Sequence, residues 1–549
     1  MSKKCVYLFI FTAVIMMSSL TWYSHSEKKA EDMLKKPITF TFFQATPGKD
    51  VPQSNRVLKR IEEKTGVTIK FEYLAGEAKQ KIGVMIASGD FPDFIDAGDG
   101  TAQMISANAL LPIENDIPKY PNLQKYLGDE WNKVKNPKDG HIYVIPQFGN
   151  VKNKDGSTSH RGEAFWIQKA VLKEFNYPKV RTLDEYFDLI KRYKEKYPTI
   201  DGEPTIGFEI LCYDWRSFCL INPPLFLAGY PNDGIGIVDE KTKTITNFAD
   251  KEIYKRYYKK LNEVYHQGLI DKEAFVENYD QYIAKLSSGR VLGMVDQAWQ
   301  FINASSSLNE MNKVERSYVP LPITYDINIP DRYADRTAIN GSSGFAITKY
   351  CKDKDRALEF LNELLNDDMQ RLVQWGEKDI DYKLDAAGKI YRTDKQREQQ
   401  KSMDYVVQNL GLPLIWFPHY EGFFDDGNAY NINEQPEEFR ASLTDYDKEL
   451  LDAYGYNTFA DFLSPAPKNP IYYPMWNMVF PTNQPETIAK AQIEELQQKY
   501  DVKMIIAKPE DVEAIWQEYL NELKKVDIAA YEKAMNEELQ RRYSEWGGF

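Results

Sequence analysis

The stretch ITFTFFQ (residues 38–44), followed by RVLKRIEEKTGVTIKFEY (residues 56–73), decides the fold of this chain. Apolar residues alternate with threonines in the first segment, and a second alternation starts at Val67, so both segments are predicted to be strands. Between them, apolar residues recur at helical spacing from Val57 and stop at Gly66, a residue type that often ends helices. The predicted order is therefore strand, helix, strand.

The same alternation continues towards the C-terminus. Apolar residues between Ile82 and Ile86 form a second helical face that ends at Gly89, and Phe94–Asp96 is predicted to be a third strand. Strands that alternate with helices form parallel sheets, whose ligands bind beyond the carboxyl ends of the strands. Side chains that follow these strands are therefore the first candidates for a binding site.

A new α/β pattern begins beyond an extended segment at residues 139–148 and indicates a second lobe. Thr182 and Glu185, three residues apart, form a predicted capping box that opens a helix. Further strands are predicted at Phe165–Ile167, Thr205–Leu211, Val291–Val295 and Gly344–Thr348, and further helices at Ala357–Leu365 and from about Glu510 onwards.

Length and composition limit the class of protein. A chain of 549 residues favours two or more compact units, and 43% apolar with 28% charged residues is typical of soluble globular proteins. The formal net charge of −13 opposes attraction to nucleic-acid phosphates and to anionic lipids. We therefore expect no nucleic-acid partner.

The N-terminus has the features of an export signal. Lys3 and Lys4 precede the apolar stretch Val6–Leu20, which is short for a membrane span, and Ser24–Lys36 is a polar, lysine-rich tether. No second segment is apolar for long enough to cross a membrane. We therefore expect an extracellular protein that contacts the membrane only through its N-terminal segment.

The sequence contains no motif of an enzyme or a metal site. There is no G-x-S-x-G elbow, no Walker loop and no G-x-G-x-x-G after a strand, and the five histidines include no pair at helical spacing. Carboxylate pairs carry no specificity among 82 Asp and Glu residues. Of the cysteines, Cys212 and Cys219 could form a bridge, but buried free thiols are the favoured interpretation. We expect no catalytic residue, no metal and no cofactor.

Several short motifs resemble, in their order and spacing, the extracellular solute-binding proteins (family 1) of carbohydrate ABC transporters, in a long lipoprotein-like branch. The motifs are Ile86-Ala-Ser-Gly-Asp-Phe-Pro-Asp93, Asp139-Gly-His-Ile-Tyr-Val-Ile-Pro146, Thr182-Leu-Asp-Glu-Tyr186, Ser288-Gly-Arg290, Phe345-Ala-Ile-Thr348 and Arg356-Ala-Leu-Glu-Phe-Leu361.

The resemblance implies a periplasmic-binding-protein-like type II fold, with two discontinuous α/β lobes that are joined by a hinge and close on a ligand. It also implies an oligosaccharide ligand, the permease subunits of an ABC transporter as partners, and a monomer at the outer face of the cell membrane. The expected divisions are a signal and tether at 1–36, the first lobe at 37–147, the second lobe at 148–322, a return to the first lobe at 323–400, and a mainly helical C-terminal part at 401–549 that packs on the second lobe and the cleft.

Two features differ from the pattern of this family. Lipoproteins of the family place a cysteine directly after the apolar leader, but Ser18–Ser26 contains none, which argues against a lipid anchor and leaves cleavage or retention of the leader open. Many relatives carry a calcium loop after the capped helix of the second lobe. Here Tyr197–Glu203 has too few carboxylates, so we expect no calcium.

Candidate sugar-binding residues are aromatic, amide, carboxylate and guanidinium side chains near strand ends, because sugars present apolar ring faces and a rim of hydroxyls. Trp215 and Trp299 are the strongest candidates, as stacking platforms in loops directly after strands. The full predicted set is Gln44, Asp96, Asp99, Tyr213, Trp215, Arg216, Asp296, Trp299, Asn340, Trp416 and Trp476.

Two other functions remain open at this point. An exported carbohydrate-active enzyme, such as a glycosidase or lyase, is supported only by the abundant carboxylates and aromatic residues. A binding protein for a non-sugar ligand, such as a peptide, has the same expected fold, and the loop tryptophans argue against it.

Overall fold

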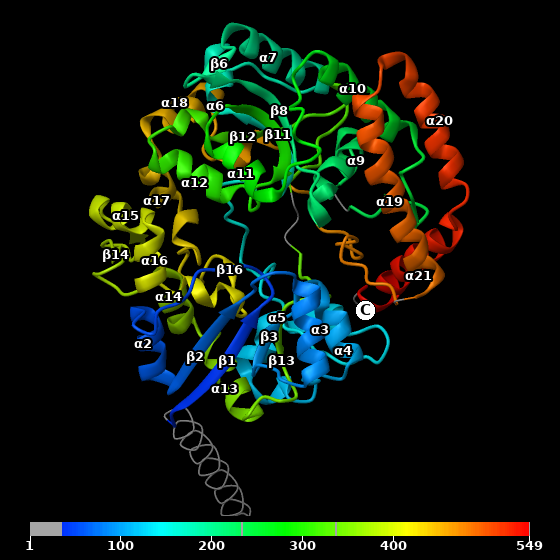
Figure 1. Ribbon diagram of the computed structural model, residues 1–549. Helices are drawn as coiled ribbons and strands as arrows, with labels where there is room; N and C mark the ends of the chain where they lie inside the picture. Colours follow the sequence, from blue (N-terminus) through cyan, green and yellow to red (C-terminus); the bar gives the residue numbers. More distant parts are fainter. Residues whose placement is uncertain (1–35, 232–233, 335–337, 482, 548–549) are drawn as a thin grey trace, which may run out of the picture. The chain divides into compact units, whose positions relative to one another are not determined.

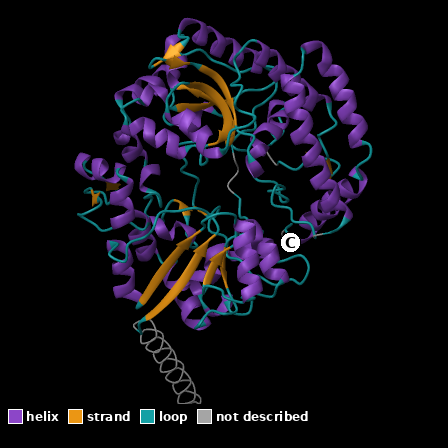
Figure 2. Cartoon of the chain, viewed as in Figure 1, coloured by secondary structure: helices purple, strands orange, loops and turns teal. Residues whose placement is uncertain are grey.

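The computed structural model describes residues 36–231, 234–334, 338–481 and 483–547. The chain forms two compact units, and each combines two separate stretches of sequence. Unit 1 contains the described residues up to Asp155 together with Ile339–Gln435. Unit 2 contains Gly156–Ala338 and the residues from Pro436 onwards. Both units mix helices and strands, as Figure 2 shows, in agreement with the expected α/β class.

Unit 1 is built on a four-stranded sheet with the strand order β13-β3-β1-β2. Strand β1 (Ile38–Gln44) runs parallel to β2 (Val67–Tyr73) and to β3 (Phe94–Asp96), while β13 (Phe345–Ile347) runs antiparallel to β3. The three parallel strands lie where the sequence predicts them. Their carboxyl ends therefore share one edge of the sheet (Figure 1).

Helices cover both faces of this sheet. Helix α2 (Arg56–Thr65) begins at Asn55, whose side chain caps it, and ends at Gly66 with a φ of 69°. Helix α3 (Ala78–Ser88) ends in the same way at Gly89, with a φ of 71°. A side chain at either glycine would be strained in this left-handed conformation, which is why the sequence marks both helix ends. The apolar sides of α2 and α3 enter different clusters of the core.

The described residues of unit 1 also contain further helices and four strands of two residues each. They are α4 (Thr101–Ser106), α5 (Pro121–Leu127), α13 (Lys354–Leu364), α14 (Asp367–Trp375), α15 (Asp394–Lys401), α16 (Met403–Asn409), β4 (Val151–Lys152), β14 (Lys383–Leu384), β15 (Ile390–Tyr391) and β16 (Glu421–Gly422).

Residues 401–435 lie in unit 1, which differs from the sequence expectation that they pack on the second lobe. The side-chain amide of Asn55 donates a hydrogen bond to the carbonyl oxygen of Val407 at 2.8 Å. The ring of Phe417 lies 4.7 Å from that of Phe345, inside the aromatic core of the sheet. These contacts join residues far apart in sequence, so no local pattern signals them.

Residues 323–334 lie in unit 2, although the sequence pattern predicts that they return to the first lobe. The backbone N–H of Thr324 donates to the carbonyl oxygen of Arg181 at 2.8 Å. The ring of Tyr333 is fully buried and lies 4.7 Å from that of Phe226. The chain therefore changes unit later than the expected boundary.

Unit 2 contains a second four-stranded sheet, with the order β12-β5-β11-β8. Strand β11 (Val291–Gln297) runs parallel to β8 (Ile206–Ile210) and antiparallel to β5 (Glu163–Gln168), which also pairs antiparallel with β12 (Tyr318–Leu321). The carboxyl ends of β8 and β11 therefore lie side by side. All four strands are buried almost throughout.

Helices also cover both faces of this second sheet. Gly293 allows a close approach of α7 (Leu183–Lys196), because a Cβ there would lie 2.1 Å from the Tyr186 hydroxyl. Asp296 points to the other face, since side chains alternate along a strand, and bonds to a tyrosine of α11 (Tyr279–Ser287). Helix α7 begins with the predicted capping box.

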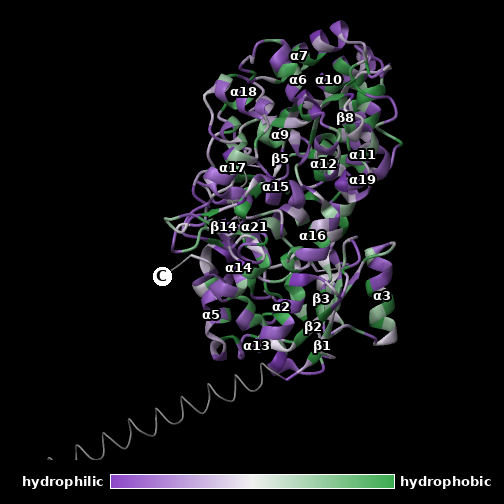
Figure 3. Cartoon of the chain, turned by 90° about the vertical axis from the view of Figure 1, so that its left-hand side faces the viewer, coloured by the Kyte–Doolittle hydropathy of each residue, from purple (hydrophilic) through white to green (hydrophobic). Residues whose placement is uncertain are grey.

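The C-terminal stretch of unit 2 forms a helical layer. The carboxylate of Asp501 in α19 (Pro485–Ile506) accepts hydrogen bonds at 2.7 Å from the hydroxyls of Tyr254 and Tyr258 in α10 (Glu252–His266). Figure 3 shows hydrophobic and hydrophilic residues interspersed along the helices, as expected for helices with one buried face.

Unit 2 also contains further helices and short strands. They are α6 (Lys169–Glu174), α8 (Phe218–Ile221), α9 (Pro223–Leu227), α12 (Ile302–Glu310), α17 (Pro436–Ser442), α18 (Asp445–Tyr454), α20 (Val512–Leu523), α21 (Ile528–Glu545), β6 (Thr199–Ile200), β7 (Glu203–Pro204), β9 (Ile237–Asp239) and β10 (Thr244–Thr246).

The N-terminal predictions fall almost wholly outside the described residues. The expected export signal and its question of lipidation concern residues 1–35, of which the structure describes none. Within the described part of the chain, no helix combines the length and the apolar character needed to cross a membrane. Cys212, Cys219 and Cys351 are free thiols.

Candidate ligand-binding site

Two tryptophans lie together at the carboxyl edge of the unit 2 sheet. Trp215 is in the 3₁₀ turn Asp214–Ser217 that follows β8, and Trp299 is in the turn that follows β11. Their rings are nearly parallel, with 6.1 Å between centroids and 15° between planes. They are 53% and 51% exposed, and Tyr213 beside them is 44% exposed. Large apolar side chains left open in this way are typical of a binding surface.

Arg216 fixes the Trp215 side of this aromatic surface. Its guanidinium forms an ion pair with Asp214 at 2.6 Å and lies over the rings of Trp215 and Tyr279, 4.6 and 4.3 Å from their centroids. The charge of Arg216 is therefore balanced within the loop. The guanidinium also makes cation–π contacts with both rings, which fix the orientation of Trp215.

Asp296 is the second-last residue of β11, directly before the turn of Trp299, and its side chain is fully buried. The carboxylate accepts hydrogen bonds at 2.7 Å from the Tyr282 hydroxyl, the Gln297 N–H and the Gln300 amide, and one from the Cys219 thiol at 3.5 Å. Burial raises its pKa to about 7, although these hydrogen bonds act in the opposite direction. In this structure Asp296 holds the turn of Trp299 through Gln297 and Gln300, and its contact with a ligand stays a prediction.

The carboxyl edge of the unit 1 sheet carries buried amides around a carboxylate. Gln44 ends β1, and Asp96 ends β3 directly opposite it. The amides of Gln44 and Gln147 each donate to Asp96 Oδ2 at 3.1 Å, while Oδ1 accepts from the Gly98 N–H at 3.0 Å. The Gln44 Oε1 atom is buried and has no hydrogen-bond partner among the residues that the structure describes. Such an atom calls for a donor from outside the chain.

Trp416 adjoins this amide cluster. Its carbonyl oxygen accepts a hydrogen bond from the Gln147 amide at 2.7 Å, and its half-buried ring meets Phe148 edge-on, with 5.9 Å between centroids. Gln147 and Phe148 are missing from the sequence-based set. They follow the motif at Asp139–Pro146, and their position directly after it is the signal that could have identified them.

The other predicted residues occupy more separate places. Asp99 is exposed in the turn after β3. The side chain of Asn340 is engaged in its own turn, where Oδ1 accepts from the Ser342 hydroxyl at 2.7 Å and Nδ2 donates to Ser343 at 3.0 Å. Asn340 thus shapes the approach to β13. Trp476 is 46% exposed in unit 2 and lies beside Gly234, where an added Cβ would come within 3.8 Å of the Cβ of the tryptophan.

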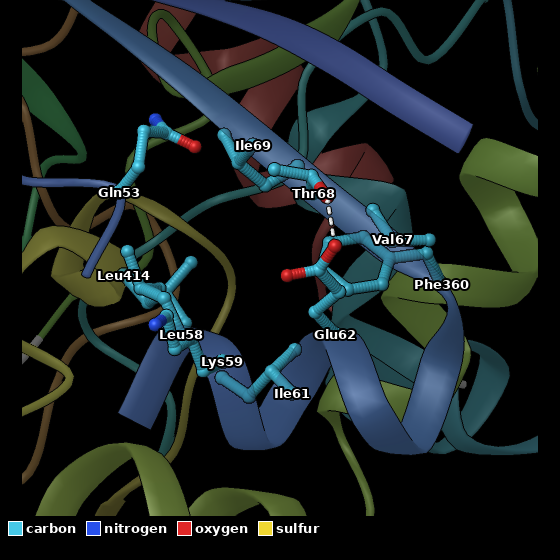
Figure 4. Close-up of a pocket in the computed structure, with 10 residues that line it drawn as sticks. All are labelled: Gln53, Leu58, Lys59, Ile61, Glu62, Val67, Thr68, Ile69, Phe360 and Leu414. Atoms are coloured by element: carbon cyan, nitrogen blue, oxygen red, sulfur yellow. Dashed lines mark hydrogen bonds between the residues drawn. The ribbon is translucent and has the colours of Figure 1, made fainter. Parts of the chain in front are cut away.

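No metal site is formed by the residues that the structure describes, since they include no suitable group of three His, Cys, Asp or Glu side chains. The segment Tyr197–Glu203 lies in the β6–β7 hairpin, and Asp201 at the tip of this hairpin forms an ion pair with Lys313 at 2.6 Å. A small pocket between α2 and β2 measures about 20 Å³ and lies near Val67, at the amino end of the strand (Figure 4). This volume is suited to a water molecule and lies away from the carboxyl edge.

Comparison with known proteins identifies a family that this chain resembles over more than half of its length. The family model described as "Bacterial extracellular solute-binding protein" matches residues 56–376. The "Fructooligosaccharide ABC transporter substrate-binding protein FusA" of Streptococcus pneumoniae is 28% identical over 260 residues, which cover 46% of this chain and 48% of FusA. The chain thus matches about half the length of that relative. "Lipoprotein LipO" of Bacillus subtilis is 24% identical over 395 residues, 67% of this chain and 71% of LipO.

Solved structures agree in fold. The structure of S. pneumoniae FusA in complex with kestose has a TM-score of 0.64 and 20% sequence identity, and the match covers 92% of this chain and 100% of FusA. The alginate-binding protein AlgQ2 without calcium ion has a TM-score of 0.59 and 18% identity, with 93% and 99% covered. At these identities the likeness concerns the fold alone.

Proposed function

This chain belongs to the bacterial extracellular solute-binding proteins, and on that premise we propose that it captures an oligosaccharide and delivers it to the permease of an ABC importer. The proposal places the protein at the outer face of the cell membrane as a monomer, held there only through its N-terminal segment. It also holds that the protein catalyses no reaction, in keeping with relatives that are named as binding proteins.

The single observation that carries this proposal is the pair of exposed, nearly parallel tryptophans at the carboxyl edge of β8 and β11. The apolar C–H face of a sugar ring gains contact area on a flat indole, and two adjacent indoles suit two linked rings. A peptide or an inorganic ion has no comparable need for such a surface. The tryptophans therefore favour a sugar over the alternative ligands.

The amide cluster of unit 1 supplies the complementary chemistry. A sugar hydroxyl can donate to the unpartnered Oε1 of Gln44 and so satisfy a buried acceptor. Asp96 and Gln147 hold that glutamine in a fixed orientation. In this proposal unit 2 binds ring faces and unit 1 binds hydroxyls. Closure of the two lobes on the ligand is part of the proposal, because a ligand that prefers the closed state shifts the population towards it.

A thermal-shift screen of the full chain tests the proposal, because a ligand that binds only the native state raises the Tm. The probes are kestose and fructo-nystose, with a tripeptide mixture as the non-sugar arm. We expect a shift with a sugar and none with peptides. A shift with peptides alone would favour the non-sugar alternative.

Two further readings complete the test. Mass spectrometry of kestose after prolonged incubation should recover the sugar intact, whereas its cleavage would identify an enzyme. Small-angle scattering should show a smaller radius of gyration with the sugar bound, and an unchanged radius would contradict lobe closure.

A further inference from the structure

The proposed function leaves open whether the sugar is uncharged or carries carboxylates, and the charges at the two edges bear on this question. The charged members of the candidate set with an exposed or half-buried position are Asp99 and Arg216, and Asp214 stands beside Arg216. Asp96 adds a buried carboxylate to unit 1. Carboxylates therefore outnumber guanidinium groups at these edges.

The one guanidinium of the candidate set is already neutralised. Recognition of a carboxylate favours the bidentate fork of an arginine or a lysine ammonium that is available for pairing. Arg216 pairs with Asp214 at 2.6 Å, stacks on two aromatic rings and keeps a side-chain exposure of only 20%. The guanidinium beside Trp215 is therefore already paired with a carboxylate, that of Asp214.

The unit 1 edge presents acceptors. The Gln44 amide donates one hydrogen bond to Asp96, the Gln147 amide donates to Asp96 and to the carbonyl oxygen of Trp416, and Gln44 Oε1 is an acceptor without a partner among the described residues. A sugar hydroxyl can donate to this atom, but an ionised carboxylate cannot. The protein's formal net charge of −13 also repels a polyanion at long range.

We propose that this site takes an uncharged oligosaccharide and discriminates against uronic-acid oligomers. The inference rests on the proposed function, because it specifies the ligand of the same site. A cation that could oppose it is Arg161, which is exposed and lies two residues before β5, close to the Trp299 turn through the hydrogen bond from the Ala298 N–H to the Gly162 carbonyl oxygen. Arg161 already has an interaction partner of its own.

Isothermal titration calorimetry of the full chain with kestose, nystose and tri-galacturonic acid tests this inference. We expect at least one uncharged sugar to bind at least about tenfold more tightly than the uronate. Equal or tighter binding of the uronate, especially if Arg161→Ala abolishes it, would overturn the inference but leave the proposed function intact. Failure of every sugar to bind would overturn the proposed function itself.

A charge variant probes the physical reason for the preference. Asp214→Asn keeps the hydrogen bond to the Arg216 N–H and a side chain that tolerates the positive φ of 47° at this position, but it releases the guanidinium. It should raise the ratio of uronate to kestose affinity by at least about threefold. Asp188→Asn, which changes the same charge in a surface pair of α7, is the matched control and should leave the ratio unchanged. An unchanged ratio in Asp214→Asn would contradict the role given to Arg216.

Discussion

The carboxyl edges of the two sheets differ in the side chains that they present, because one edge exposes aromatic rings and the other holds buried polar groups. The unit 2 edge exposes the rings of Trp215 and Trp299 and buries its carboxylate, Asp296. The unit 1 edge buries Gln44 and Asp96 at the strand ends themselves. The difference suggests a division of work, in which one edge contributes contact area and the other contributes directed hydrogen bonds.

The position of each residue relative to its strand explains this difference. Gln44 and Asp96 are the last residues of β1 and β3, so sheet pairing and packing still enclose them. Trp215 and Trp299 lie in turns beyond their strands, where the chain has left the sheet. A polar group inside the edge is held rigidly, whereas an aromatic group beyond it remains open to a ligand.

Removal of both tryptophans should have the largest effect. We expect Trp215→Ala or Trp299→Ala alone to weaken kestose binding by at least about tenfold, roughly 1.4 kcal/mol, and the double variant to abolish measurable binding. The Tm without ligand should change little, because both rings are about half exposed. Calorimetry and thermal unfolding measure the two quantities.

A matched exposed aromatic residue controls for this result. Tyr350 is 49% exposed and its ring stacks on that of Phe91. Both residues lie near the amino end of β3, where Phe94 pairs with Ile347, so they are at the edge of the unit 1 sheet opposite to Gln44 and Asp96. Tyr350→Ala should leave kestose affinity unchanged. If both tryptophan variants bind as tightly as the parent, the rings are packing elements, and if they unfold, they belong to the core.

Loss of a unit 1 amide should have an intermediate effect. Gln44→Ala removes the unpartnered acceptor together with a donor to Asp96, and we expect kestose binding to weaken by about fivefold to tenfold. Gln396→Ala serves as the control, because Gln396 is a buried glutamine of the same unit that caps a helix. If the two variants affect calorimetric affinity equally, the amide cluster has no specific role in binding.

The pH dependence distinguishes the positioning role of Asp296 from ordinary burial. Burial raises its pKa to about 7, so the folded state binds a proton that the unfolded state releases at lower pH. The contribution of this residue to the free energy of unfolding therefore falls as the pH rises from the ordinary Asp range to about 7. Denaturant unfolding at several pH values should show a smaller loss in Asp296→Asn than in the parent, because the raised pKa values of the buried Asp501 and Glu209 contribute a loss of the same sign in both.

The affinity for the ligand should also depend on the protonation of Asp296, but it should decrease at low pH, where the stability contribution of this residue increases. Protonation removes the negative charge that strengthens the hydrogen bonds from Gln297 and Gln300 to Asp296 Oδ1, so the anchor of the Trp299 turn weakens. Kestose affinity should therefore decrease by about threefold below pH 7 in the parent and lose this dependence in Asp296→Asn. Tyr279 also interacts electrostatically with Asp296, and Glu163 and Glu209 act on its hydrogen-bond partners Cys219 and Tyr282. Asp501→Asn, in the buried pair with Tyr254, should keep the pH dependence of the parent.

Trp476 should contribute least among the exposed tryptophans. It lies beside Gly234, and the ring contacts of Trp215 are with Phe218 and Trp299. Trp476→Ala should therefore change kestose affinity by no more than about twofold. A loss as large as that of Trp299→Ala would extend the aromatic surface to this segment.

Local patterns in the sequence predicted most of the fold. The glycines at positions 66 and 89, the alternation of β1 and β2, and the capping box of α7 each depend on neighbours within a few residues. The unit boundaries did not follow from such patterns, because the contact of Phe417 with Phe345 joins distant segments. Spacing therefore defines elements, while packing decides where each element belongs.

The candidate site was predictable to a similar degree. Sequence reasoning placed Trp215 and Trp299 after strands, and the structure brings their rings together. It could not determine that Asp296, two residues before an exposed turn, is fully buried. Whether this side chain is covered depends on helix α11, which packs on its face of the sheet and is distant from the strand pattern itself. Gln147 was missed because it comes from a crossing segment with no strand before it.

A crystal structure of the full chain with kestose would test the central claim most directly. The account predicts a sugar ring face in contact with the indole of Trp215 or Trp299, and a sugar hydroxyl within hydrogen-bond distance of Gln44 Oε1. A bound sugar that leaves both indoles exposed to solvent and Gln44 Oε1 without a partner would contradict it.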